Sequence, residues 1–158
     1  MLIPPKITIG QYSVAGKKTH NDDSYGVMMP EGQLLAGKGV AMAIADGMSS
    51  SEGAKEASET CIKSFLSDYY DTPDSWTVQT AVGRVLSATN RWLQAQGVSR
   101  YDSDTGMATT FSGLILKAGN AHIFHVGDSR IALLRGCNAR ALTRAHHSKG
   151  AGGKEFLA

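Results

Sequence analysis

GVAMAIADGM, residues 39–48, is the stretch that decides the fold of this chain. The residues from Val40 to Ala45 are apolar and uncharged, and such a run is typical of a strand that is covered on both faces. It ends in Asp46-Gly47, which places a carboxylate at the tip of the strand. A carboxylate followed by an unhindered backbone carbonyl offers two oxygen ligands to a hard cation such as Mg²⁺ or Mn²⁺. A simple turn after a buried strand would account for the same two residues.

Length and composition indicate one globular domain without a charged interaction surface. The chain has 158 residues, enough for a sizeable core. A net charge of +2, without a cluster of Lys and Arg, argues against nucleic acid as a partner. Cys61 and Cys137 form neither a disulfide framework nor a zinc motif, which fits a reducing compartment. The chain shows no bilayer-spanning apolar stretch and no signal peptide, so we expect a cytoplasmic location and no membrane partner.

Outward from the central stretch, hydrophobic periodicity predicts a layered α+β domain. Two strands are expected before it, and two long helices after it. Three further strand-like runs, joined by short turns, predict an antiparallel meander. Strands, then helices, then strands are the order of an α+β domain. The expected elements are strands at 7–13 and 24–29, a helix over 54–69 with N-cap candidates at 49–51, a helix from 75 or 77 to 95 with Gly97 past its end, and strands at 108–116, 121–126 and 131–134.

Acidic residues stand at three expected boundaries between strand and loop. These are Asp22-Asp23, Asp46-Gly47 and Asp128 within VGDSR. Adjacent carboxylates at 22 and 23 repel each other unless they are solvated or share a cation. Asp128 could equally lie in a β-turn and form a weak surface pair with Arg130. Each position taken by itself therefore has an ordinary structural explanation.

Taken together and in order, these motifs resemble the bacterial form of the PP2C-type metal-dependent protein serine/threonine phosphatases. The resemblance extends over nearly the whole chain. It implies a PP2C-like β-sandwich of two antiparallel sheets flanked by helix pairs, of which residues 1–158 would be the N-terminal two-thirds of a single domain. The matching segments are KxxNDDS at 18–24, ADGM at 45–48 with Gly53 and Ala57-Ser58 after it, GMATT at 106–110, VGDSR at 126–130 and LTRAH at 142–146.

The resemblance also implies a role for each acid. Asp46 would bridge two Mn²⁺ or Mg²⁺ ions, with the Gly47 carbonyl on one of them. Asp22 and Asp23 would hold or orient metal-bound waters, and Asp128 matches an acid of a third, weaker metal site. Lys18 stands where the family has an arginine that grips the substrate phosphate. Two cations lower the pKa of a bridging water and clamp the phosphoryl oxygens, so no protein nucleophile is required.

The chain departs from the family pattern at several positions. Lys18 supplies charge but lacks the bidentate fork of arginine. Asp22 replaces a glutamate and Ala145 replaces an aspartate. The two remaining metal-binding aspartates of the family lie C-terminal to anything in this sequence. We therefore expect an incomplete ligand set and little turnover by the chain alone.

The activity implied by the resemblance is hydrolysis of phosphoserine and phosphothreonine by a metal-activated water. The substrate would be a phosphorylated protein, and a cognate Ser/Thr kinase would be a second partner. The alternative is a catalytically inactive phosphoprotein-binding or regulatory module that keeps the fold.

Overall fold

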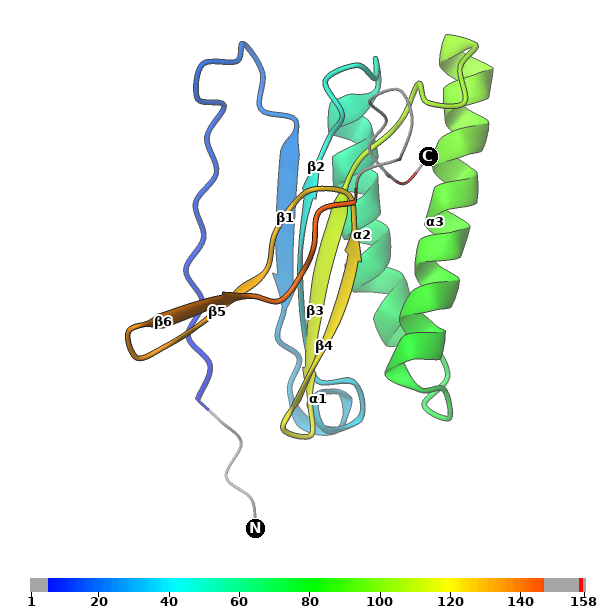
Figure 1. Cartoon of the computed structure of the whole chain (residues 1–158). Coiled ribbons are helices and arrows are strands. Elements are labelled where there is room, and N and C mark those ends of the chain that lie inside the picture. Colours follow the sequence, from blue (N-terminus) through cyan, green and yellow to red (C-terminus); the bar gives the residue numbers. More distant parts are fainter. Residues whose placement is uncertain (1–5, 147–156, 158) are drawn as a thin grey trace.

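A four-stranded antiparallel sheet, backed by two long helices, forms the centre of the computed structural model, which describes residues 6–146 and 157 (Figure 1). The strands lie in the order β1-β2-β3-β4, and a separate hairpin, β5-β6, projects from the sheet. The architecture is the expected α+β arrangement of antiparallel sheets and helices. The elements are β1 (Asp23–Met28), α1 (Gly32–Lys38), β2 (Val40–Asp46), α2 (Ala54–Asp71), α3 (Val78–Tyr101), β3 (Phe111–Lys117), β4 (Asn120–Val126), β5 (Ala132–Arg135) and β6 (Asn138–Ala141).

Strand β2 lies in the interior of the sheet, between β1 and β3, as its apolar sequence predicts. Its alternate residues Ala41, Ala43 and Ala45 are buried and belong to the core under the helices. Small side chains on this face let α2 pack close to the strand. The expectation of cover on both faces was wrong, because Ile44 on the opposite face remains 44% exposed.

Aromatic and aliphatic residues from α2, α3 and β3 fill the core between the helices and the sheet. The rings of Phe65 and Phe111 meet edge to face, with centroids 4.9 Å apart. Both side chains are fully buried, as are Leu93 of α3 and Ile115 of β3. Helix α2 packs directly on β1 and β2, and α3 packs on α2. The core thus fixes β2 against α2, and with it the strand end that carries Asp46.

Both predicted long helices are present, but their ends differ from expectation. Gly53, not one of the preceding serines, occupies the N-cap of α2, and no side chain caps it. Ser51 instead donates to the Thr105 carbonyl oxygen at 2.7 Å. Helix α3 runs past Gly97 to a left-handed cap at Asp102. Gly97 lies inside the helix, and a Cβ there would stand 2.7 Å from the Ser103 carbonyl oxygen. The loop after α3 can therefore approach the helix closely only because this residue is glycine.

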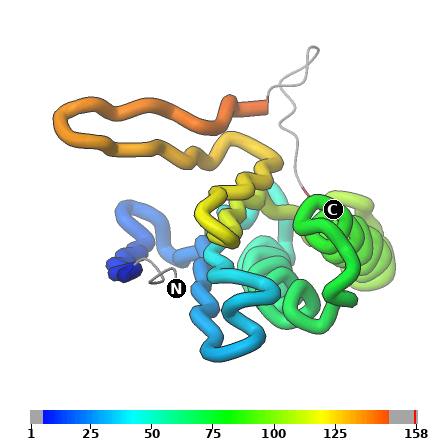
Figure 2. The backbone as a smooth tube through the Cα atoms, turned by 90° about the horizontal axis from the view of Figure 1, so that it is seen from below, coloured from blue at the N-terminus to red at the C-terminus, as the bar shows by residue number. Residues whose placement is uncertain are grey.

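The strands also depart from the sequence prediction in three places. Residues 7–13 form no strand, and a short helix, α1, lies between β1 and β2. The meander stops after β4, because the chain turns at Gly127 with a φ of +105°. The next strand, β5, then pairs with β6, which was not predicted. Seen from below, the hairpin and the N-terminal segment lie on the side of the sheet away from the helices (Figure 2).

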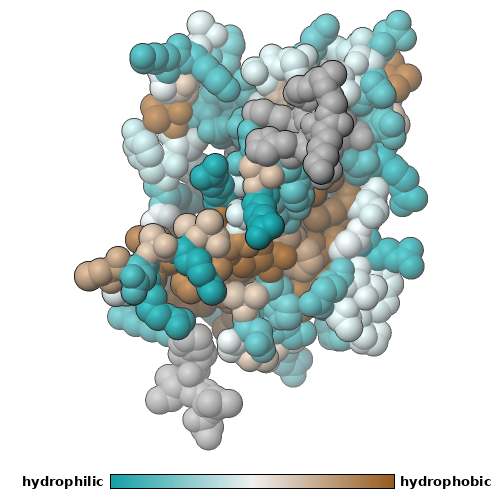
Figure 3. All heavy atoms as spheres, viewed as in Figure 1, coloured by the Kyte–Doolittle hydropathy of each residue, from teal (hydrophilic) through white to brown (hydrophobic). Residues whose placement is uncertain are grey.

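The face of the sheet opposite the helices is apolar and only partly covered. Tyr25 and Ile44 are 45% and 44% exposed on it. Hydrophobic side chains gather around the hairpin and the sheet beneath it (Figure 3). A groove runs along this face between residues 9–13 and the base of the hairpin, and it ends at Asp23 and Asp46. Among the residues that the structure describes, no helix is long and apolar enough to cross a membrane.

Candidate active site

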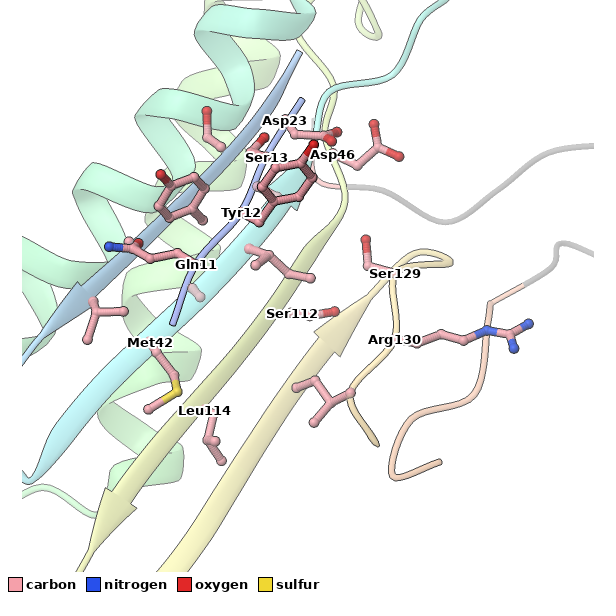
Figure 4. Close-up of a pocket in the computed structure, with 18 of the residues that line it drawn as sticks. Gln11, Tyr12, Ser13, Asp23, Met42, Asp46, Ser112, Leu114, Ser129 and Arg130 are labelled. Atoms are coloured by element: carbon pink, nitrogen blue, oxygen red, sulfur yellow. The ribbon is translucent and has the colours of Figure 1, made fainter. Parts of the chain in front are cut away.

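Asp46 ends β2 and lies directly opposite Asp23, the first residue of β1. Residues paired across an antiparallel ladder place their side chains on the same face, a few ångströms apart. The two carboxylates accordingly lie next to each other at one end of the groove (Figure 4). The structure thus brings together two of the acids that the sequence singled out.

Gly47 allows the chain to leave β2 against two other backbone segments. A Cβ at this position would overlap the Ala54 carbonyl oxygen at the start of α2 and would lie 3.0 Å from the Asp22 carbonyl oxygen. The Gly47 amide donates to that Asp22 oxygen at 3.2 Å. Close approach of backbone, rather than a positive φ, therefore requires glycine here.

The first turns of α2 hold the loop that carries Asp22 and Asp23. The Ser58 hydroxyl donates to the Asp22 carbonyl oxygen at 2.6 Å, and the Lys55 ammonium donates to the Asp23 carbonyl oxygen at 2.9 Å. The Asn21 side chain accepts from the Asp23 amide at 3.1 Å. All three bonds engage the main chain of the two acids, so they fix the loop without using the carboxylates.

The electrostatics of the site centre on Asp46. Burial raises the pKa of its carboxyl above the ordinary value of 3.8, and the charge and hydrogen bond of Asp23 raise it further. The charge of Asp128 acts in the same direction, and that of Lys18 opposes it. Lys18, Asp23 and Asp128 therefore all lie within electrostatic range of Asp46. A cation between the carboxylates would relieve their repulsion.

Asp128 follows β4, in a loop that is bonded to the end of β2 through side chains. The hydroxyls of Ser129 and Thr110 are hydrogen-bonded at 2.9 Å, and Thr110 also accepts from the Asp46 amide. Arg130 is exposed and is among the residues that line the groove (Figure 4). Sequence reasoning assigned no role to Thr110 or Ser129, although both stand inside matched motifs. The signal that could have found Thr110 is its place in GMATT, immediately before a strand.

The donor set suits a hard divalent cation, although it is small. Carboxylate and carbonyl oxygens are the ligands of Mg²⁺ and Mn²⁺, and the charge of Lys18 opposes the repulsion of Asp46 by Asp23 less strongly than Asp23 exerts it. Across residues 6–146 and 157, however, no three His, Cys, Asp or Glu side chains are grouped closely enough to hold a metal. The described residues thus do not by themselves form a complete set of metal ligands.

A sequence model of the family described as Protein phosphatase 2C matches residues 11–157. The chain belongs to this family. The matched range spans Lys18 and the acids at 22, 23, 46 and 128. The comparison with curated proteins found no match.

Solved structures of PP2C-type phosphatases show the same fold. Stp1 from Staphylococcus aureus superposes with a TM-score of 0.73 at 17% identity, over 92% of this chain and 59% of that structure. PstP/Ppp from Mycobacterium tuberculosis gives a TM-score of 0.64 at 24% identity, over 82% and 50%. A structure of the PstP catalytic domain in complex with two manganese ions matches with the same score and identity, over 82% and 51%. The chain therefore spans about half the length of these solved relatives.

Proposed function

We propose that this chain is the metal-binding N-terminal part of a single PP2C domain that hydrolyses phosphoserine and phosphothreonine in proteins. The observation that carries the proposal is the pairing of Asp46 with Asp23 at the end of β2, where burial and like charge raise the pKa of Asp46. Support comes from the family match and from the relative that binds two manganese ions. A phosphorylated protein would be the substrate and a cognate Ser/Thr kinase the second partner, in the cytoplasm.

In this proposal, each site residue holds metal or phosphate. Asp46 and the Gly47 carbonyl would hold Mn²⁺ or Mg²⁺. Asp22 and Asp23 would accept hydrogen bonds from metal-bound water, and Asp128 would contribute to a third, weaker ion. Such cations would lower the pKa of a bound water and neutralise the phosphoryl oxygens. Lys18 brings a positive charge to the mouth of the site, where a phosphate would enter.

The proposal is tested by comparing the 158-residue chain with a version extended along its reading frame to the length of the solved relatives. Both should bind Mn²⁺, the short chain more weakly, because Mg²⁺ and Mn²⁺ need more oxygen ligands than the described acids supply. Only the extended version should hydrolyse p-nitrophenyl phosphate and a phosphothreonine peptide at a Mn²⁺-dependent rate. Mn²⁺ titration followed by electron paramagnetic resonance, and a phosphate-release assay, measure the two effects.

Two outcomes would contradict the proposal. Equal Mn²⁺-dependent rates in both versions would show that the short chain already holds a complete site. Mn²⁺ binding without turnover in the extended version would favour an inactive phosphoprotein-binding module.

Lys18→Ala in the extended version should weaken phosphopeptide use through binding. We expect KM to rise roughly 1.4–5-fold with little change in kcat, because an exposed charge pair contributes only about 0.2–1 kcal/mol. Lys17→Ala removes the neighbouring exposed lysine and serves as the matched control. Lys18→Arg should keep the KM of the wild type or lower it, since guanidinium can bind phosphate through two hydrogen bonds. A KM that is the same in Lys18→Ala and Lys17→Ala would remove Lys18 from the site.

A further inference from the structure

Thr110 is buried, with 3% of its surface exposed, at the point where the chain enters β3. Its backbone amide donates to the Asp46 carbonyl oxygen at 2.9 Å, and its hydroxyl accepts from the Asp46 amide at 3.0 Å. One residue thus engages both backbone polar groups of Asp46. These two hydrogen bonds fix the backbone of Asp46, and with it the point at which the side chain begins.

The same hydroxyl reaches the loop that carries Asp128. A threonine hydroxyl offers one donor and two acceptor positions, so after accepting from the Asp46 amide it can still bond to another group. That group is the Ser129 hydroxyl, with an Oγ1–Oγ distance of 2.9 Å. Ser129 follows Asp128 directly, so Thr110 Oγ1 joins the two segments that bear these acids.

The two acids repel each other across this link. Burial and then Asp23 are the main causes that raise the pKa of Asp46, and the charge of Asp128 adds a smaller contribution in the same direction. The side chains of Asp46 and Asp128 are both only partly exposed. Repulsion between like charges tends to move their segments apart when no cation lies between them. The Thr110 hydroxyl opposes such a movement by holding the main chain of one segment and a side chain of the other.

We propose that Thr110 is a positioning residue, whose hydroxyl sets the spacing between Asp46 and Asp128 and so prepares the site for a divalent cation. The inference rests on the proposed function of this site, and it adds a residue for which neither the sequence motifs nor the acid cluster provided a role. Thr110 does not bind the ion or the phosphate itself. It acts through the backbone of Asp46 and the side chain of Ser129.

Thr110→Val tests the role of the hydroxyl, because valine keeps the size and shape of threonine. Thr110→Ser keeps the hydroxyl and should behave as wild type. Thr109→Val is the matched control, since Thr109 is also fully buried, but its hydroxyl donates to the Thr110 carbonyl oxygen and not to the site. All variants are made in the 158-residue chain, and their melting temperatures separate a loss of stability from a loss of metal binding.

Two measurements are made on these proteins. Amide hydrogen exchange without metal should show faster exchange of the Asp46 amide in Thr110→Val only, because its acceptor is gone. Mn²⁺ titration should show a loss of affinity of about 10–100-fold in Thr110→Val, the range found when a group that supports a metal ligand is removed. Thr110→Ser and Thr109→Val should keep the wild-type affinity.

The outcomes separate this inference from the proposed function. Unchanged Asp46 exchange in Thr110→Val, or unchanged Mn²⁺ affinity while Asp46→Asn loses Mn²⁺, would overturn the positioning role and leave the proposed metal site standing. An equal loss of affinity in Thr109→Val would also overturn it, since the effect would then follow from core disruption. Failure of the wild-type chain to bind Mn²⁺ would overturn the proposed function, and this inference with it.

Discussion

Asp46→Asn should abolish Mn²⁺ binding and Mn²⁺-dependent phosphatase activity, and yet raise the melting temperature of the metal-free chain. Asparagine keeps the shape of aspartate but cannot balance the charge of a cation. Removing the carboxylate that we propose as a direct ligand should cost more than the roughly 10–100-fold lost when an outer-shell partner is removed. We therefore expect Mn²⁺ affinity in the 158-residue chain, and turnover in the extended version, to fall to background.

The gain in stability follows from the direction of the pKa shift. The pKa of Asp46 is raised in the folded chain above its ordinary value of 3.8, by burial first and then by Asp23. The folded state consequently holds this proton more tightly than the unfolded state. Its stabilising effect is present at low pH and is lost as pH rises from about 3.8 through the folded pKa. Asparagine removes this loss, so the metal-free variant should be the more stable protein at neutral pH.

Thermal unfolding in EDTA and in excess Mn²⁺, at pH 4 and pH 7.5, checks both halves of this expectation. Wild type should be stabilised by Mn²⁺ at pH 7.5, and Asp46→Asn should not. Asp68→Asn, an exposed acid on α2, is the control and should change neither quantity. A variant that melts below wild type in EDTA at pH 7.5 would show that the Asp46 carboxylate stabilises the metal-free fold instead of straining it.

Gly47→Ala should damage both the fold and the site. An added Cβ meets backbone atoms of Ala54 and Asp22, which cannot rotate away as a side chain could. Overpacking of this kind costs about 1–3 kcal/mol in the free energy of unfolding. The strain falls on the start of α2 and on the Asp22 loop, so Mn²⁺ binding should fall along with stability.

Gly83→Ala should change the stability of the same protein in the opposite direction. Gly83 lies in α3, is exposed, and has no atom within 4 Å of the position that a Cβ would take. Alanine there should raise the free energy of unfolding by about 0.5–1 kcal/mol, because glycine loses more backbone freedom in a helix. Urea unfolding of both variants measures the difference. If Gly47→Ala were as stable as wild type, the close packing at the end of β2 would not be needed.

The parts of the site that could be predicted are those that depend only on residues adjacent in the sequence. The uncharged run before Asp46 predicts a buried strand, and the abrupt change to Asp46-Gly47 predicts its exposed end. The pairing of Asp46 with Asp23 also depends on how β1 returns to β2. That return contains helix α1, which the sequence pattern did not predict.

The contacts of Thr110 lay beyond local sequence reasoning for a different reason. Its hydroxyl bonds to an amide 64 residues earlier in the chain, and no periodicity encodes a partner at such a distance. The open face of the sheet has a similar explanation. An apolar run such as that around Ile44 is compatible with a strand that is buried on one face or on both. The sequence alone therefore does not predict that one face of this strand is exposed.

The position of β2 inside the sheet has a consequence for synthesis on the ribosome. β2 pairs with β1, which is already made, but its other edge pairs with β3, which follows only after both long helices. At roughly 5–20 residues per second, the ribosome needs several seconds to make that intervening segment. Throughout this interval the apolar stretch from Val40 to Ala45 has one open backbone edge, which can pair with other nascent chains. The strand that carries Asp46 is therefore open to pairing with other chains until β3 emerges.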